Sequence, residues 1–192
     1  MFCLPQSRSI GSPRLFLFSD RSLAWKMNPL CLAGIDMTVE MNLILSKIIS
    51  GGQTGVDRAA LDVALALGIP CGGWCPKGRL SEDGPISSKY PLREMPSPKY
   101  PVRTEKNIRE SDGTLVLTWG PVTGGTALTV KLAGKHRKPY LVVDLSRGGN
   151  PQEVKNWLRT QDIKTLNVAG PRESKVLGIH DKAVEFLKMI LV

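Results

Sequence analysis

Strand-like and helix-like segments alternate along the chain from residue 42 to the C-terminus. Short apolar runs typical of strands lie at 42–50, 69–74, 114–119, 139–145 and 165–168. Helix-like segments lie between them at 56–67, 104–111, 126–133 and from 150 onward, and a last helix begins at Pro171 or Ser174. This alternation favours a parallel sheet with crossover helices on both faces. We therefore expect an α/β fold, a Rossmann-like doubly wound parallel sheet in a three-layer sandwich.

A glycine-bearing loop follows each predicted strand, at 51–55, 76–84, 120–126, 146–150 and 170–174. The carboxyl ends of parallel strands share one edge of the sheet, and open α/β sheets bind their ligands there. Glycine lets backbone N–H groups approach a ligand closely, and a helix N-terminus attracts negative charge. The same loops carry the basic residues Lys77, Arg79, Arg147 and Arg172. Together they indicate a site for a phosphate group or another oxyanion.

Several of these polar residues also have a purely structural interpretation. Thr54 and Asp57 have the spacing of a helix capping box, and Thr104 and Thr126 would cap the helices that they begin. Helix 126–133 would end at Gly134. Asn150, followed by Pro151 and Glu153, is the expected start of another helix. For Thr54, Asp57 and Thr126, capping and ligand contact are both open.

The first 41 residues show no sustained helix or strand period. We expect them to be a disordered extension or the result of a start site placed too early, with a degenerate targeting peptide as the rival interpretation. Residues 42–192 would then form a single Rossmann-like ligand-binding domain. The formal net charge of +9 lies almost wholly in this domain, which has 22 basic and 14 acidic residues.

A basic domain attracts phosphate esters, oxyanions, nucleic acids or acidic membranes. Nucleic-acid binding is disfavoured because basic and aromatic residues are not interleaved as in single-strand binders. No apolar run approaches the length of a membrane span, so no membrane partner is expected. The four cysteines, Cys3, Cys31, Cys71 and Cys75, have neither a disulfide framework nor zinc-site spacing. They indicate a reduced, cytoplasmic protein without a metal site of its own.

The run from Ile48 to Arg58 resembles the opening of the putative molybdenum carrier family. The resemblance continues through 72–79, 82–86, 90–92, 103–107, 111–114 and 123–126, and covers roughly residues 42–192. That family is similar to molybdenum cofactor carriers, to the Lonely Guy (lysine-decarboxylase-like) phosphoribohydrolases and to DprA-type DNA-binding proteins. The resemblance implies a Rossmann-like fold with a nucleotide- or phosphate-type ligand at the glycine-rich loops.

The chain departs from the phosphoribohydrolases at one position. Their motif Pro-Gly-Gly-x-Gly-Thr-x-x-Glu ends on a catalytic glutamate, whereas here Gly125-Thr126-Ala127-Leu128 is followed by Thr129. Threonine cannot act as the carboxylate acid or base. We therefore expect a non-catalytic carrier. The alternative is a nucleotide N-glycosidase in which Asp57, Glu82 or Asp83 replaces the glutamate.

The expected ligand is a pterin cofactor that bears phosphate, such as the molybdenum cofactor, or a nucleotide. Molybdenum would come inside the cofactor or as an oxyanion, because no thiolate or imidazole cluster could ligate it. The apolar end, 186–192, would pack in its own core or against a second copy in a homo-oligomer. The expected ligand-binding residues are Gly51, Gly52, Gln53, Thr54, Gly55, Asp57, Lys77, Gly78, Arg79, Thr104, Asn107, Thr123, Gly124, Gly125 and Thr126, together with Glu82, Asp83 and Arg172.

Overall fold

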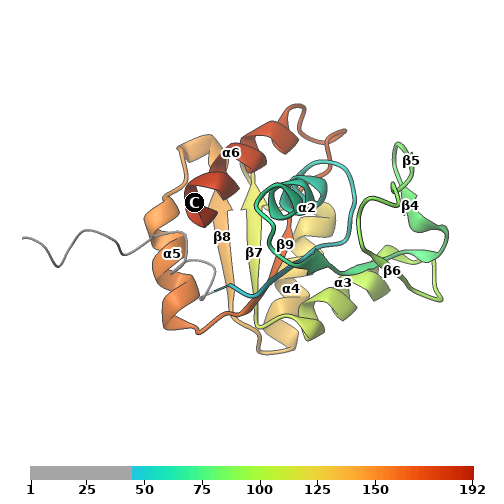
Figure 1. The fold of residues 1–192 in the computed structure, drawn as a ribbon, viewed down its shortest axis with the longest axis horizontal. Coiled ribbons are helices and arrows are strands. Elements are labelled where there is room, and N and C mark those ends of the chain that lie inside the picture. The colour runs from blue at the N-terminus through green and yellow to red at the C-terminus, as the bar shows by residue number, and fades with distance from the viewer. Residues whose placement is uncertain (1–44) are drawn as a thin grey trace, which may run out of the picture. The chain divides into compact units, whose positions relative to one another are not determined.

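A computed structural model describes residues 45–192 (Figure 1). The expectations for residues 1–41 therefore lie outside the described part of the chain. The strands are β1 (Lys47–Ile49), β2 (Cys71–Gly72), β3 (Trp74–Cys75), β4 (Leu80–Ser81), β5 (Gly84–Pro85), β6 (Arg93–Glu94), β7 (Gly113–Thr118), β8 (Tyr140–Asp144) and β9 (Thr165–Ala169). The helices are α2 (Val56–Ala66), α3 (Tyr100–Glu110), α4 (Gly124–Lys135), α5 (Pro151–Thr160) and α6 (Ile179–Leu191), with single 3-10 turns at Lys77–Arg79 and Leu145–Arg147.

The central sheet has five parallel strands in the order β2-β1-β9-β7-β8, which confirms the predicted fold class. The last strand in the sequence, β9, lies at the centre of the sheet between β1 and β7. If β9 is counted as the first strand, the order becomes 3-2-1-4-5, the order of the Rossmann fold. The chain therefore has the Rossmann arrangement with its first strand moved to the C-terminal end. The point where the strand order reverses lies between β9 and β7.

Helices cover both faces of this sheet. On one face α6 contacts both α2 and α5, and on the other face α3 and α4 pair. This division is what right-handed crossovers require, because connections that run in opposite directions along the sheet place their helices on opposite faces. No helix in the described residues is long and apolar enough to cross a membrane.

The two faces of the sheet differ in polarity. Toward α2, α5 and α6 the strands present Ile48, Leu115, Leu117, Leu166 and Val168, which form the main core with those helices. On the opposite face, β7 and β9 present buried polar side chains, since side chains alternate along a strand. There, Asn167 Nδ2 donates to Thr114 Oγ1 at 3.2 Å. A small apolar cluster of Ile108, Leu132 and Ala133 holds α3 to α4 on this side.

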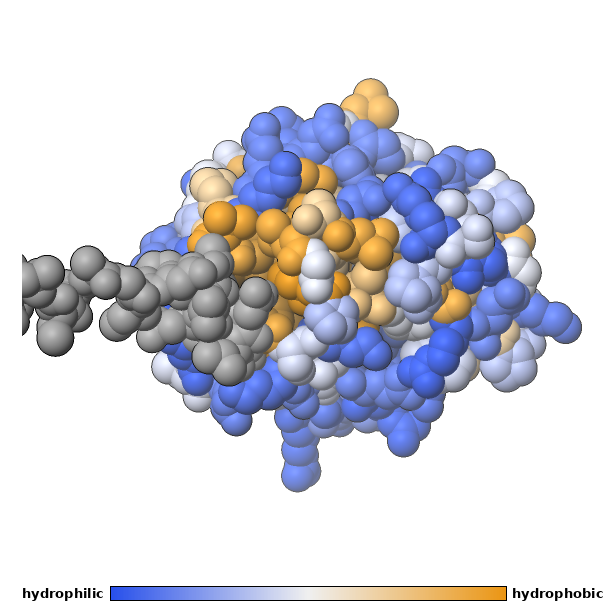
Figure 2. Space-filling model, in the orientation of Figure 1, coloured by the Kyte–Doolittle hydropathy of each residue, from blue (hydrophilic) through white to orange (hydrophobic). Residues whose placement is uncertain are grey.

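The C-terminal helix packs mainly into the domain's own core. Phe186, Leu187 and Ile190 are buried, whereas Met189 and Val192 are exposed. Figure 2 shows apolar residues gathered near the middle of one face of the molecule. Formation of a homo-oligomer stays a prediction.

The predicted helices exist, but three of their starts differ. Helix α3 begins at Tyr100 rather than Thr104, and the Thr104 hydroxyl donates to the Tyr100 carbonyl at 3.0 Å inside the helix. Helix α4 begins at Gly124 and runs through Gly134, so Thr126 is not its cap. Helix α6 begins only at Ile179, because residues 171–178 form a loop before it. By contrast, the predicted cap Asn150 is confirmed: its side chain accepts from the N–H groups of the next turn.

The predicted strand 69–74 divides into two. Its first part is β2 in the central sheet, and its end is β3, which pairs with β6. The long glycine- and proline-rich segment after it contains the β4–β5 hairpin. This segment packs on α2 through a second apolar cluster of Leu61, Cys75, Ile86, Tyr90 and Leu92.

Candidate functional site

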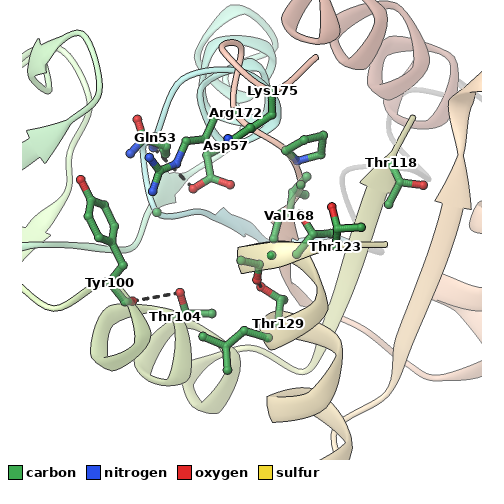
Figure 3. Close-up of a pocket in the computed structure, with 18 of the residues that line it drawn as sticks. Gln53, Asp57, Tyr100, Thr104, Thr118, Thr123, Thr129, Val168, Arg172 and Lys175 are labelled. Atoms are coloured by element: carbon green, nitrogen blue, oxygen red, sulfur yellow. Dashed lines mark hydrogen bonds between the residues drawn. The ribbon is translucent and has the colours of Figure 1, made fainter. Parts of the chain in front are cut away.

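A pocket of about 690 Å³ lies at the carboxyl ends of the three central strands, β1, β9 and β7 (Figure 3). The loops that follow these strands line it, together with the N-terminal halves of α3 and α4. Its place is the reversal of strand order, where open α/β sheets bind ligands. Its volume suits a small molecule such as a nucleotide.

One wall of the pocket is the N-terminus of α4. In the first turn of α4 the Thr126 N–H donates to the Thr123 carbonyl at 3.1 Å, whereas the N–H groups of Gly124 and Gly125 have no partner within the helix, and Thr123, the N-cap, supplies no side-chain acceptor. Side chains added at Gly124 or Gly125 would meet nothing within 4 Å, so this end of the helix is open. Open N–H groups and the positive end of the helix dipole together favour an anion.

The opposite wall carries positive charge. The side chains that line the pocket include Arg103, Arg172 and Lys175 but a single acidic group, Asp57. The Arg172 guanidinium lies 5.0 Å from the centre of the Tyr100 ring. Figure 3 shows Gln53, Asp57 and Arg172 across the pocket from Thr129 of α4. The excess of cations over carboxylates makes the pocket attractive to an anionic ligand.

Arg103 is held by a buried ion pair. Its Nη1 lies 2.9 Å from Asp57 Oδ2, and the two side chains are 12% and 6% exposed. Asp57 also accepts a long hydrogen bond of 3.4 Å from the Gln53 N–H. A Cβ atom at Gly51 would lie 0.9 Å from Arg103 Nη1, so the guanidinium occupies the space that a side chain at Gly51 would need. Gly51 thus serves the site by making room for Arg103.

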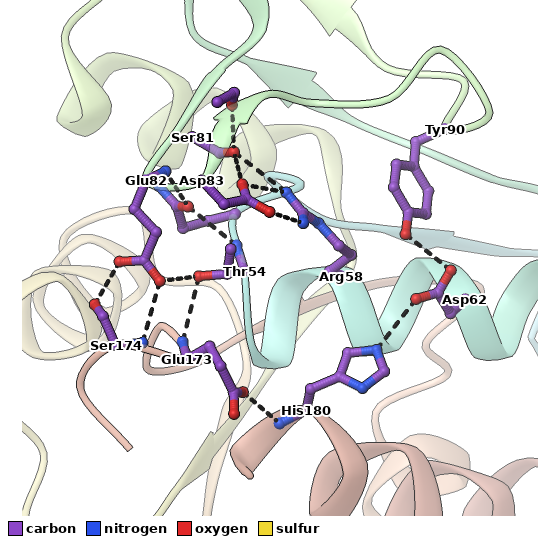
Figure 4. Close-up of polar contacts among 12 residues, drawn as sticks. Thr54, Arg58, Asp62, Ser81, Glu82, Asp83, Tyr90, Glu173, Ser174 and His180 are labelled. Carbon is purple, nitrogen blue, oxygen red and sulfur yellow. Dashed lines mark hydrogen bonds and ion pairs between the residues drawn. The ribbon is translucent and has the colours of Figure 1, made fainter. Parts of the chain in front are cut away.

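The β4–β5 hairpin ties the loops around the pocket together (Figure 4). Glu82 hydrogen-bonds to the Thr54 hydroxyl and accepts from the Ser174 N–H at 3.1 Å, which joins the loops after β1 and β9. Burial opposes ionisation of Glu82, but bonds from Ser174 and Thr54 outweigh it and lower its pKa. Asp83 pairs with Arg58 of α2 at 2.5 Å, and this bond holds the pKa of Asp83 well below its usual range.

These contacts change the interpretation of four residues expected at the site. Thr54 is not a helix cap: the N-cap of α2 is Gly55, which has no side chain, and the Thr54 hydroxyl is directed to Glu82. Glu82 and Asp83 do not line the pocket, and they bind Ser174 and Arg58 instead. Gly55 packs against the backbone of the loop after β9.

The expected cations of the loop after β3 do not reach the pocket. Lys77 is exposed to solvent, and the Gly78 N–H donates to Glu94 at 2.7 Å. Arg79 donates to four backbone carbonyls at 2.8–3.1 Å, those of Ile86, Ser87, Tyr90 and Leu92. A guanidinium satisfied in this way stabilises its own loop. Gly52 likewise packs toward Ile86 and Leu92 and does not line the pocket.

The pocket brings together ten of the expected residues: Gly51, Gln53, Asp57, Thr104, Asn107, Thr123, Gly124, Gly125, Thr126 and Arg172. Asn107 lines it, but its amide is already paired with the backbone of Trp74 at 2.8 and 3.1 Å. Three further lining residues, Tyr100, Arg103 and Lys175, were not among the expected ones. Two of them could have been found from the sequence: Lys175 is one residue beyond the predicted loop 170–174, and Arg103 is the first residue of the family-like motif 103–107.

The remaining candidate groups have structural contacts. Thr129, which stands in place of the hydrolase glutamate, lines the pocket, and its hydroxyl donates to the Gly125 carbonyl at 3.1 Å. His180 lies outside the pocket, between Asp62 at 3.1 Å and Asp181 at 2.9 Å. Among residues 45–192, no cluster of His, Cys, Asp and Glu side chains could hold a metal ion.

Comparisons with known proteins agree with this architecture. The model of the circularly permutated YpsA SLOG family matches residues 48–191. The crystal structure of a putative molybdenum carrier protein from Syntrophus aciditrophicus SB is 45% identical, with a TM-score of 0.75 over 78% of this chain and 96% of that one. No curated protein matches the chain. The predicted resemblance to molybdenum carrier-like proteins is confirmed, and the central position of β9 fits a permuted chain. The protein therefore belongs to the circularly permutated YpsA SLOG family.

Proposed function

We propose that the protein is a carrier that binds an anionic, phosphate-bearing small molecule in the pocket between β9 and β7. The ligand is a molybdopterin-type cofactor or a nucleotide. The observation that carries this proposal is the composition of the pocket: the open N-terminus of α4 lies on one side, and Arg103, Arg172 and Lys175 lie on the other. N–H groups and guanidinium groups are the donors that phosphate oxygens prefer.

Molybdenum would reach this site inside the cofactor or as an oxyanion. The solved relative is called a putative molybdenum carrier protein. The donors of the pocket suit oxygen atoms that surround a molybdenum centre, whereas soft metals need thiolate ligands. The two described cysteines, Cys71 and Cys75, do not line the pocket.

A carrier function is supported over hydrolysis because the candidate catalytic carboxylates are all engaged by other protein groups. Asp57 is the acidic side chain of the pocket, and it is paired with Arg103. Glu82 and Asp83, the other candidates for a general acid or base, are engaged by Ser174 and Arg58. A cytoplasmic location is a further part of this proposal.

Gly125→Asp tests the function by separating binding from folding. A side chain at Gly125 points into open space, and a carboxylate in the first turn of a helix stabilises it. We expect the melting temperature to stay level or rise, while affinity for anions falls at least tenfold. Calorimetric titration with molybdate, inorganic phosphate and adenosine 5′-monophosphate measures the affinity, and mass spectrometry identifies any ligand that co-purifies.

The matched control is Gln161→Glu, which adds the same charge at an exposed position beyond α5. It should bind the probes like the wild type. If none of the three anions binds the wild-type protein or raises its melting temperature, the proposed function is wrong.

A further inference from the structure

The side-chain amide of Gln53 has a fixed orientation at the wall of the pocket. Its Oε1 accepts hydrogen bonds from the backbone N–H groups of Thr54 and Glu82, each at 3.0 Å. Amide oxygen and nitrogen are assigned from such bonds. Because both partners are donors, only the oxygen can face them, and the nitrogen is directed elsewhere.

Two donors at this wall have no acceptor. Gln53 Nε2 and Arg103 Nε are both buried without a hydrogen-bond partner, and both residues line the pocket. Gln53 as a whole is only 4% exposed. Native proteins rarely leave buried donors unpaired, and each such group calls for an explanation. Within the described residues no protein group pairs either atom, and both side chains line the pocket, so a group bound in the pocket is the acceptor nearest at hand.

The chemistry of the two donors selects the acceptor. One belongs to a neutral amide and the other to a guanidinium that is always charged. The ion pair with Asp57 uses Nη1 of Arg103 and leaves Nε, on another edge of the guanidinium, without an acceptor. Hydrogen bonds from guanidinium groups to oxyanions are among the stronger ones in proteins, because they are charge-assisted.

We propose that Gln53 Nε2 and Arg103 Nε bind the oxygen atoms of the ligand's anionic group, a tetrahedral oxyanion. The inference rests on the proposed function and adds where that group is held: at the wall formed by the β1 loop and α3, across the pocket from α4. A phosphate ester and a free oxyanion such as molybdate both present such tetrahedral oxygen atoms.

Gln53→Glu tests this directly. A carboxylate oxygen still accepts from the N–H groups of Thr54 and Glu82, so the loop keeps its bonds. The donor that faces the oxyanion is replaced by a negatively charged acceptor. We expect a loss of affinity of at least tenfold for each anion that the wild type binds. Gln161→Glu, the same change at an exposed position, should alter affinity less than twofold.

Arg103→Lys is the second variant and covers the case in which Gln53→Glu fails to fold. It keeps the positive charge beside Asp57 but removes Nε and the planar fork, so affinity should again fall at least fivefold. Arg159→Lys on the exposed surface of α5 is its control. Melting temperatures of all four variants verify folding.

The probes distinguish the source of the oxyanion. Inorganic phosphate and molybdate represent free ions, and adenosine 5′-monophosphate represents a phosphate ester. Loss of affinity for all three, or for the ester alone, supports the subsite and identifies its preferred ligand. Folded Gln53→Glu and Arg103→Lys proteins that bind every probe like the wild type would overturn it. If Gly125→Asp still weakens binding in that case, the proposed function stands and only this inference falls. If the wild type binds none of the probes, both fail.

Discussion

Gly51→Ala should disrupt the buried Arg103–Asp57 ion pair at the wall of the pocket without contacting a ligand. The added methyl group would lie 0.9 Å from Arg103 Nη1 and 2.8 Å from Asp57 Oδ2. The end of an arginine side chain can swing away, so the steric clash itself costs little. The cost arises because Asp57, whose side chain is 6% exposed, then loses its cation.

Loss of one partner from a buried ion pair costs about 3–5 kcal/mol. Arg103 is 12% exposed, and water that enters would soften the loss, so we adopt the lower value of about 3 kcal/mol. For a domain of this size, each kcal/mol corresponds to about 2–4 °C in melting temperature. We therefore expect Gly51→Ala to melt about 6–12 °C below the wild type.

Thermal and urea unfolding, followed by circular dichroism, measure this effect, and titration with inorganic phosphate measures the site. The control is Gly134→Ala, inside α4, where a Cβ meets nothing within 4 Å. It should raise stability by about 0.5–1 kcal/mol, because glycine is unfavourable in a helix. A Gly51→Ala protein that melts within about 2 °C of the wild type and binds phosphate normally would refute the reasoning about Arg103.

Three further predictions concern the elements around the site. Asn150→Ala removes the cap of α5 and should cost about 1 kcal/mol in urea unfolding, and an unchanged midpoint would contradict the capping geometry. Glu82→Gln should speed amide hydrogen exchange in residues 171–178, since Ser174 loses a charged acceptor, and unchanged exchange would show that other contacts hold that loop. Burial opposes protonation of His180, but bonds to Asp181 and Asp62 outweigh it and raise its pKa. The stability that His180 contributes is therefore full below its ordinary pKa of about 6.5 and lost as pH rises through the folded value, and His180→Gln should flatten this pH dependence of the melting temperature.

The local features of the fold could be predicted because local chemistry determines them. The apolar runs of β7 and β8 and the cap at Asn150 need no distant partner to be recognised. The start of α6 could not be predicted in the same way. Glu173, five to seven residues earlier, accepts from the N–H groups of Gly178 and His180, so a loop side chain determines where the helix begins. Such a contact depends on how the loop folds back, which no periodicity reveals.

The strand order explains which expected cations reach the pocket. Sequence alternation places all the glycine loops at one edge of the sheet but does not say which strands are neighbours. With β9 between β1 and β7, the loops after these three strands converge, and Arg172 is brought in. Strands β2 and β8 lie at the two ends of the sheet. Arg79, which follows β2 in the chain, and Arg147, which follows β8, therefore remain outside the pocket.

The missing positive charge comes instead from a crossover helix. Helix α3 leads from the β2 end of the sheet to β7, and its N-terminal half passes the carboxyl ends of the central strands. Arg103 on this helix fills the space left by Gly51 and pairs with Asp57 of α2. The sequence suggested that the backbone of Gly51 binds phosphate, but in the structure Gly51 makes room for the Arg103 guanidinium. In a permuted sheet of this kind, the pocket depends on three segments that are distant in sequence, and only the strand order brings them together.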